Sequence, residues 1–483
     1  MLIAALAAFA TLLLSRPFIP LESAAATPGL VAVVSCVTLL PLIGMVVQRR
    51  FDFFELICPV SVSYFLYFAI APRNPIPEVG TAFPWITDRE INLGLLYVGM
   101  GFSFLMAGYY SPLPAKIARV LPRFAPISSE AGVHAVIYTL YAVGALVRLY
   151  LLAHGTGTWS TIPQEFESGS PLPAAVENIG YFNNLALFAY LFATAYYFSP
   201  GRTRLLSVVL WGVMFPLECG WVFLQGSKGL SIPVLLSPLI AYNYLRKKVG
   251  YKQILVPALF FVFVVFPVIS EYRSFAGRYP IQLDTLTQNL PKIGEELVEG
   301  IATPESDTFV GKAPELVTER TSGLLPLAST IHYVAQNGQL HGETLQQMYL
   351  VILPGFLVTD KYQQLAESGD IYREDVSGYY DTRSGITIMQ VGEFYLNFGL
   401  WGVLIGMFLQ GVLFRVWQLY WISAGGALNI ALYTLGWRML TVIEFPIAVG
   451  YGLIVRELMM MIPLGWIMVR GHSIAEQPGR TPG

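Results

Sequence analysis

The chain has 483 residues, of which 55% are hydrophobic and 12% are charged, and its formal net charge is −2. With a mean hydropathy of +0.57 it has too few polar side chains to cover a soluble globular protein of this length. The near-neutral charge gives no indication of nucleic-acid binding. The composition therefore excludes an ordinary soluble enzyme and predicts an all-α polytopic membrane protein.

Apolar segments long enough to cross a bilayer, about 20 residues each, recur along the chain and predict about twelve transmembrane helices. The first is short, and residues 1–26 also resemble a signal peptide, although no basic residue precedes the apolar run. We favour a retained helix there. The predicted spans are 2–15, 29–48, 54–72, 91–109, 133–153, 179–198, 204–224, 230–245, 253–270, 395–419, 427–446 and 449–469.

The distribution of basic residues between alternate loops predicts the orientation of these spans, because cytoplasmic loops are enriched in Lys and Arg. One set of loops is rich in basic residues and should be cytoplasmic, which also places both termini inside. Its basic residues are Arg49, Arg50, Lys116, Arg119, Arg123, Arg202, Arg204, Arg246, Lys247, Lys248 and Lys252.

The spans and loops divide the chain into four parts: helices 1–9 in residues 1–270, an extracytoplasmic loop or lid in 271–385, helices 10–12 in 386–470, and a cytoplasmic tail in 471–483. The loop holds 16 acidic and 8 basic residues, a net charge of −8. Residues 323–334 and 348–358 are apolar but shorter than a span. They are typical of interfacial or re-entrant helices that could form a lid, or of segments packed onto the spans. Glu295, Glu296 and Glu299 predict the polar side of a short helix.

Charged residues inside spans are costly and mark either buried pairs or water-filled cavities. Arg148, Glu218, Glu444 and Arg456 fall in the outer halves of four predicted spans, and Arg438 lies nearer the midplane. This agreement in depth favours a polar cavity that opens to the outside. The alternative is buried pairing without chemistry, for example of Glu444 with Arg438 or Arg456.

Two short motifs flank the predicted loop. The first is Gly-Ser-Lys-Gly at 226–229, followed after the next span by Arg273 and Arg278. The second is Gly-Glu-Phe-Tyr-Leu-Asn-Phe-Gly-Leu-Trp-Gly at 392–402. Both motifs resemble those of Wzy-type O-antigen polymerases, which join lipid-linked oligosaccharide repeat units. The resemblance covers roughly 205–460 and implies a GT-C-like fold. The chain departs from the family at Lys228, where Arg is usual, and in lacking an Arg-x10-Gly pattern.

The resemblance implies a transferase that releases a diphosphate from an undecaprenyl-linked donor. Lys228, Arg273 and Arg278 are then candidates to neutralise the departing diphosphate, although simple anchoring at the membrane surface explains them as well. Glu393 is the leading candidate for the general base, ahead of His332, Asp381 and Glu218. The alternative for Glu393 is a carboxylate that stabilises a helix N-terminus.

The chain has no Asp-x-Asp motif and its histidines are scattered, so we expect a metal-independent enzyme without a cofactor. The expected partners are the undecaprenyl-diphosphate-linked oligosaccharide, membrane lipid and a chain-length regulator protein. The expected location is the bacterial inner membrane with the active site facing the periplasm. The alternatives are an O-antigen ligase, which delivers the glycan to lipid A core, and a transporter or flippase for the lipid-linked sugar.

Overall fold

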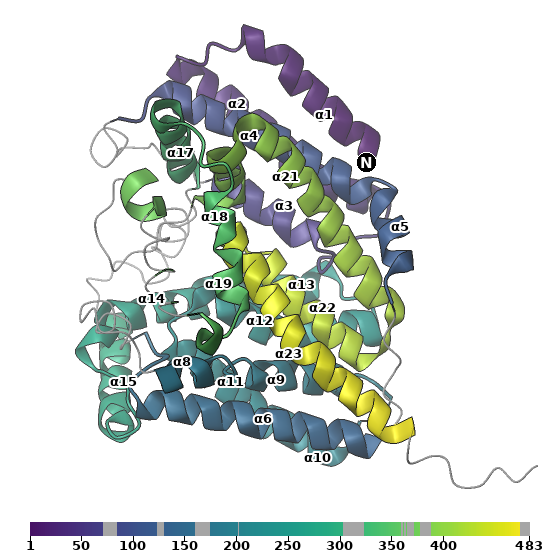
Figure 1. Cartoon of the computed structure of the whole chain (residues 1–483), viewed down its shortest axis with the longest axis vertical. Helices are drawn as coiled ribbons and strands as arrows, with labels where there is room; N and C mark the ends of the chain where they lie inside the picture. Colours follow the sequence, from purple (N-terminus) through teal and green to yellow (C-terminus); the bar gives the residue numbers. More distant parts are fainter. Residues whose placement is uncertain are drawn as a thin grey trace, which may run out of the picture.

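The computed structural model describes residues 1–70, 85–122, 130–159, 174–200, 202–302, 323–358, 361, 364, 371–376 and 388–473. Within these residues every regular element is helical (Figure 1). Helix occupies the greater part of each of the twelve segments that hydropathy predicts as spans. Apolar segments favour helix in a bilayer because the backbone groups must be hydrogen-bonded within the segment.

The helices of the first 278 residues are joined in places by short π or 3-10 turns, such as the π-turns Leu66–Ile70, Leu210–Met214 and Phe261–Val265. The helices are α1 (Leu2–Ser15), α2 (Thr27–Val47), α3 (Ile57–Phe65), α4 (Asp88–Tyr110), α5 (Leu113–Val120), α6 (Glu130–Ala153), α8 (Ala174–Gly180), α9 (Leu185–Tyr197), α10 (Arg204–Val209), α11 (Phe215–Leu224), α12 (Lys228–Leu245), α13 (Tyr251–Phe260) and α14 (Phe266–Phe275). Those that follow are α15 (Leu286–Ala302), α17 (Leu324–Asn337), α18 (Glu343–Gln346), α19 (Met348–Ile352), α21 (Met389–Ala424), α22 (Gly426–Leu440) and α23 (Ile447–Ser473).

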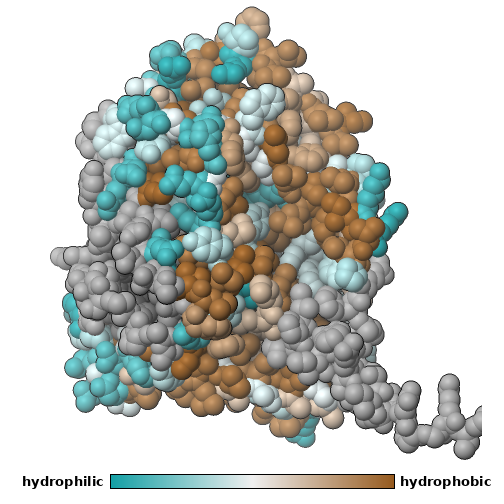
Figure 2. Space-filling model, viewed as in Figure 1, coloured by the Kyte–Doolittle hydropathy of each residue, from teal (hydrophilic) through white to brown (hydrophobic). Residues whose placement is uncertain are grey.

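Six helical segments of the described chain are long and apolar enough to cross a membrane, so the protein is a helical membrane protein. The total of twelve spans stays a prediction. Figure 2 shows a wide apolar band, with hydrophilic residues gathered over α15 and α17 on one side and over α5 on the other. The six segments are Ala24–Val47, Asp88–Tyr110, Ala131–Ala153, Arg204–Leu224, Tyr251–Arg278 and Met389–Ala424.

Helix α4 lies at the centre of one half of the molecule and packs against α1, α2, α17 and α21 (Figure 1). Its contact with α21 is close because glycines meet backbone there. A Cβ atom on Gly108 would collide with the carbonyl group of Phe408, and one on Gly411 would collide with that of Leu105. Small residues allow such close approach of membrane helices. The contact holds α21 firmly against α4.

The segments between α14 and α21 pack onto the apolar helices. Helix α15 has the predicted polar side, with Glu295 and Glu299 exposed, while Ile293 is buried against Tyr272 and Phe275. Helix α17 packs against α4 and α21, and α19 packs along α23. The two short apolar stretches of the loop therefore lie on helices of their own chain.

Candidate functional site

Helix α21 turns back on itself at Gly399, which has φ 62° and ψ −153° and so leaves the helical conformation. Gln410 donates a side-chain hydrogen bond to Gln390, although the two residues are 20 positions apart. A Cβ on Gly402 would collide with the carbonyl oxygen of Phe394. Residues 389–398 therefore form a short helix that runs antiparallel to the beginning of 400–424.

This hairpin corrects the predicted start of the span at residue 395, because the first residues of that range belong to the short helix. The positive φ at Gly399 ends the short helix, and glycine is the residue that adopts this conformation without steric cost. The second motif of the sequence, 392–402, thus encodes a turn between two helices. The sequence predicted a single span over 395–419 there.

The end of the short helix is capped by residues 340–342 of the loop. The backbone N–H of Leu340 donates to the carbonyl of Leu396 at 3.0 Å, and that of His341 donates to the carbonyl of Asn397 at 3.0 Å. The Gly342 N–H donates to the Asn397 side-chain oxygen at 2.9 Å. These bonds satisfy carbonyl groups that a helix end leaves without intrahelical partners, and they fasten the loop to the hairpin.

Glu393 lies on the short helix and its side chain is fully buried. Its Oε1 accepts hydrogen bonds from the hydroxyl groups of Thr344 at 3.0 Å and Tyr372 at 3.1 Å. Its Oε2 accepts the backbone N–H of Ile447, the first residue of α23. We call Glu393 with Thr344, Tyr372 and Ile447 the Glu393 hub. It joins α21, the loop and α23.

The contacts of Glu393 favour a positioning role. Burial, and then the nearby Glu393 carboxylate, raise the pKa of the Tyr372 phenol, which therefore stays protonated and able to donate. A general base must come within hydrogen-bond reach of the hydroxyl group that it deprotonates, whereas Glu393 has no exposed surface. The predicted stabilisation of a helix N-terminus is observed, but the helix is α23 and not the one that carries Glu393.

Two of the other predicted catalytic residues lie elsewhere. His332 is on α17, where its Nδ1 is 3.5 Å from the Glu90 carboxylate and its Nε2 is 2.8 Å from the Gln336 amide. These contacts tie α17 to the start of α4. Asp381 lies outside the described residues.

The Gly-Ser-Lys-Gly motif forms the corner between α11 and α12. Gly226 has φ 60°, and a Cβ there would lie 2.9 Å from the Trp159 side chain and 3.2 Å from that of Arg273. The Arg273 guanidinium stacks 3.5 Å from the centroid of the Trp159 ring, whose indole N–H donates to the Arg273 carbonyl at 3.3 Å. Segments distant in sequence therefore meet at this point. We call residues 226–228 with Trp159 and Arg273 the cation corner.

Lys228 is the first residue of α12, and the Ser227 hydroxyl caps this helix by accepting the N–H of Leu230 at 3.3 Å. The Lys228 ammonium lies 3.7 Å from the centroid of the Phe266 ring, on α14. A helix N-terminus beside two cations is an environment suited to an anion. The cation corner brings two half-buried cationic side chains to the start of α12, and their charged groups lie over different aromatic rings, those of Phe266 and Trp159.

Arg278 is separate from this arrangement. Its side chain is 62% exposed and its guanidinium is 3.4 Å from Glu296 on α15. Of the three predicted cations, Lys228 and Arg273 therefore belong to the cation corner, whereas Arg278 points toward the acidic side of α15.

Four of the charges inside the apolar helices form two buried pairs. Arg148 on α6 donates two hydrogen bonds to Glu218 on α11, at 2.5 Å and 3.0 Å, and both side chains are buried. Arg438 on α22 donates to Glu457 on α23 at 2.6 Å, and these side chains are also buried. Buried ionic pairs of this kind are the arrangement expected of charges in a membrane core.

The suggested pairing of Glu444 with Arg438 or Arg456 is wrong. Helix α22 ends at Leu440, so Glu444 lies beyond it and accepts a hydrogen bond from the Tyr67 hydroxyl. Arg438 instead faces Glu457 across α22 and α23. The guanidinium of Arg456 lies 5.2 Å from the centroid of the Tyr181 ring.

Two adjacent asparagines connect the ion pairs, and sequence reasoning missed them. The Asn183 side-chain oxygen accepts from Arg148 Nε at 3.2 Å, and the Asn184 amide donates to Glu457 at 2.6 Å. The signal in the sequence was a polar doublet directly before the apolar run of α9. It did not reveal which charges the doublet would meet.

Within the described residues, His, Cys, Asp and Glu side chains form no cluster of three or more that could hold a metal ion. The expectation of a metal-independent enzyme stays a prediction. No protein-family model matches the chain, and neither do curated proteins or solved structures.

Proposed function

We propose that this protein is a membrane glycosyltransferase that polymerises undecaprenyl-diphosphate-linked oligosaccharide repeat units on the periplasmic side of the bacterial inner membrane. The observation that carries the proposal is the cation corner, in which Arg273 packs against the turn before Lys228 and the N-terminus of α12. This chemistry fits a diphosphate, and the apolar helices around it fit an isoprenoid chain.

In the proposed reaction a hydroxyl group of the acceptor sugar forms a bond to the anomeric carbon of the donor sugar. The bond from that carbon to the lipid diphosphate breaks, and the diphosphate leaves with the electron pair. Lys228, Arg273 and the first N–H groups of α12 stabilise the charge that develops on the leaving group. The proton of the attacking hydroxyl group passes to a general base, for which we retain His332 and Asp381 as candidates because Glu393 is fully buried in its hub.

Reconstitution tests the proposal directly. Purified protein in proteoliposomes is incubated with a lipid-linked repeat unit, and the products are separated by length. We expect a ladder of glycans that still carry the lipid diphosphate. Lys228→Ala should weaken the ladder, while Lys252→Ala, which removes an exposed lysine at the start of α13, should leave it intact.

The two rival functions give different products. Transfer of a preformed glycan to lipid A core without a ladder would indicate a ligase. Movement of the lipid-linked sugar across the bilayer without a new glycosidic bond would indicate a transporter or flippase. Either result would overturn the proposal.

A further inference from the structure

The two buried ion pairs and the asparagine doublet form one continuous polar network inside the apolar helices. It runs from Glu218 to Arg148, then to Asn183 and its neighbour Asn184, and ends at Glu457 with Arg438. Each step is a side-chain hydrogen bond of 2.5–3.2 Å, apart from the covalent link between the two asparagines. The network therefore crosses from α6 and α11 to α22 and α23.

One end of the network lies beneath the cation corner. Glu218 is on α11, the helix that ends directly before the corner. The Arg148 guanidinium also lies 5.1 Å from the centroid of the Trp221 ring, on the same helix. The Leu224 carbonyl, at the end of α11, accepts from the Tyr272 hydroxyl of α14 at 3.0 Å. The position of α11 thus affects both cations.

The other end reaches the Glu393 hub. Glu457 is on α23, and the first N–H of that helix donates to Glu393. Tyr181, in the turn that carries the asparagines, donates to the Ile352 carbonyl of α19 at 3.2 Å. A Cβ on Gly452 of α23 would lie 2.9 Å from Val351 of α19. The asparagine turn is therefore packed against the elements that hold the hub.

We propose that Asn183 and Asn184 are positioning residues that couple the cation corner to the Glu393 hub through this network. Asn184 is the sensitive link because Glu457 Oε2 and Arg438 Nε are buried without a hydrogen-bond partner in the described part of the chain. Glu457 accepts hydrogen bonds from Asn184 and Arg438. Loss of the Asn184 amide would leave its buried carboxylate with Arg438 as the remaining one of these two donors, which is costly in a low-dielectric environment.

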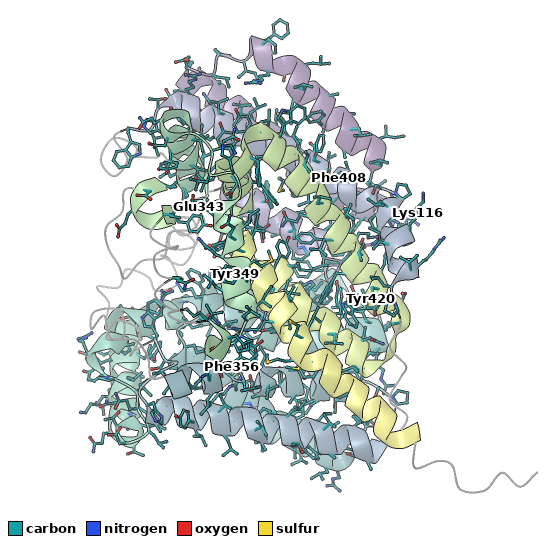
Figure 3. The ribbon with its side chains drawn as sticks, in the orientation of Figure 1. Lys116, Glu343, Tyr349, Phe356, Phe408 and Tyr420 are labelled. Atoms are coloured by element: carbon teal, nitrogen blue, oxygen red, sulfur yellow. The ribbon has the colours of Figure 1, made fainter. Side chains whose placement is uncertain are left out.

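The test measures geometry and does not depend on the proposed reaction. Spin labels are attached to Ser274→Cys, beside Arg273, and Glu343→Cys, beside Thr344, both of which are exposed. Cys36 and Cys219 are replaced by alanine, and Cys58 is fully buried. Figure 3 shows Glu343 on α18, toward the opposite side of the molecule from Lys116 on α5. Double electron–electron resonance spectroscopy then gives the distribution of distances between the two spin labels in the reconstituted full chain.

We expect Asn184→Leu to shift or broaden this distribution. The matched control is Asn429→Leu, since Asn429 is at least as buried as the partly buried Asn184 but donates to Gly425 within its own chain segment, at 2.6 Å. A distribution unchanged by Asn184→Leu would overturn the coupling, as would an equal change in the control. Should Asn184→Leu fail to fold, Asn184→Ala removes the amide donor without adding a larger apolar side chain, and the same criteria apply to it.

Activity gives a second readout if the proposed function holds. The Michaelis constant for the lipid-linked donor should rise about tenfold in Asn184→Leu, because small misplacements of binding groups have large effects. A lower unfolding temperature with unchanged kinetics and unchanged label distances would identify a purely structural asparagine and overturn the coupling.

Discussion

The cation corner and the Glu393 hub come from the two motifs of the same family resemblance, yet they differ in access to solvent. Lys228 and Arg273 are half-buried and stacked on aromatic rings. Glu393 is fully buried and accepts three hydrogen bonds from three separate segments. The first region is partly open to solvent, whereas the second is closed and joins three segments of the chain. A charged residue in a motif is therefore a candidate for either role, and its exposure helps to distinguish a side chain that can bind a ligand from one that holds helices together.

The largest effect is expected at the hub. Glu393→Ala should lower the free energy of unfolding by about 3–5 kcal/mol, because it leaves buried donors of Thr344, Tyr372 and Ile447 without an acceptor. Glu393→Gln should cost about 1 kcal/mol, since the amide oxygen can still accept from Ile447 and the two hydroxyl groups can reorient. Unfolding in mixed detergent micelles measures both values. Equal losses in the two variants would contradict the hub.

The next effect is expected at the corner, on activity. Arg273→Ala should slow glycan transfer about a hundredfold, the size expected when one stabilising charge is removed from a transition state. Arg202→Ala is the matched control, because Arg202 also lies over an aromatic ring, 5.8 Å from the Tyr197 centroid, but at a different place in the chain. A comparable loss of transfer rate in both variants would show that the cation corner is not the proposed diphosphate site.

A smaller effect is expected at the turn that separates the two helices of the hairpin. Gly399→Ala should cost about 1–3 kcal/mol, because its φ is 62° and its new Cβ would lie 2.6 Å from the Gln339 amide. Gly425→Ala shares the positive φ, 65°, but meets no atom within 4 Å. The difference between their unfolding free energies measures how firmly the loop docks on the hairpin. No difference would mean that the Gln339 side chain moves aside and does not contribute to the docking.

The smallest effect is expected at Arg278. This side chain is 62% exposed and its partner Glu296 is 3.4 Å away, so Arg278→Ala should change the transfer rate less than about fivefold and leave stability unaltered. Rates measured beside Arg273→Ala provide the comparison. A loss of transfer rate as large as that of Arg273→Ala would show that Arg278 also acts in the proposed diphosphate site.

Much of the fold was predictable, because apolar length is a local property. Helix occupies the greater part of every segment that hydropathy selected, and the polar side of α15 was also anticipated. The hairpin at Gly399 was not anticipated, since an apolar run that continues across a glycine predicts a single helix. The glycines at 399, 402 and 406, with polar Gln390 and Gln410 on either side, were the available signal.

The candidate site was less predictable, because side-chain partners depend on tertiary packing. Arg148 and Glu218 were recognised as unusual charges, but their pairing and its link to Asn183 required the positions of α6, α9 and α11. Glu393 stood out in its motif as a candidate general base, but its burial depends on Ile447 and Thr344, 54 and 49 residues away. Spacing alone could not distinguish a reactive carboxylate from a buried one.

The most direct test compares Glu393→Gln and Arg273→Ala in one assay of glycan polymerisation from a lipid-linked repeat unit, with protein amounts matched. Our account predicts that Glu393→Gln keeps its rate within about tenfold of the unchanged protein and that Arg273→Ala loses about a hundredfold. Loss of polymerisation in Glu393→Gln with a normal rate in Arg273→Ala would contradict it.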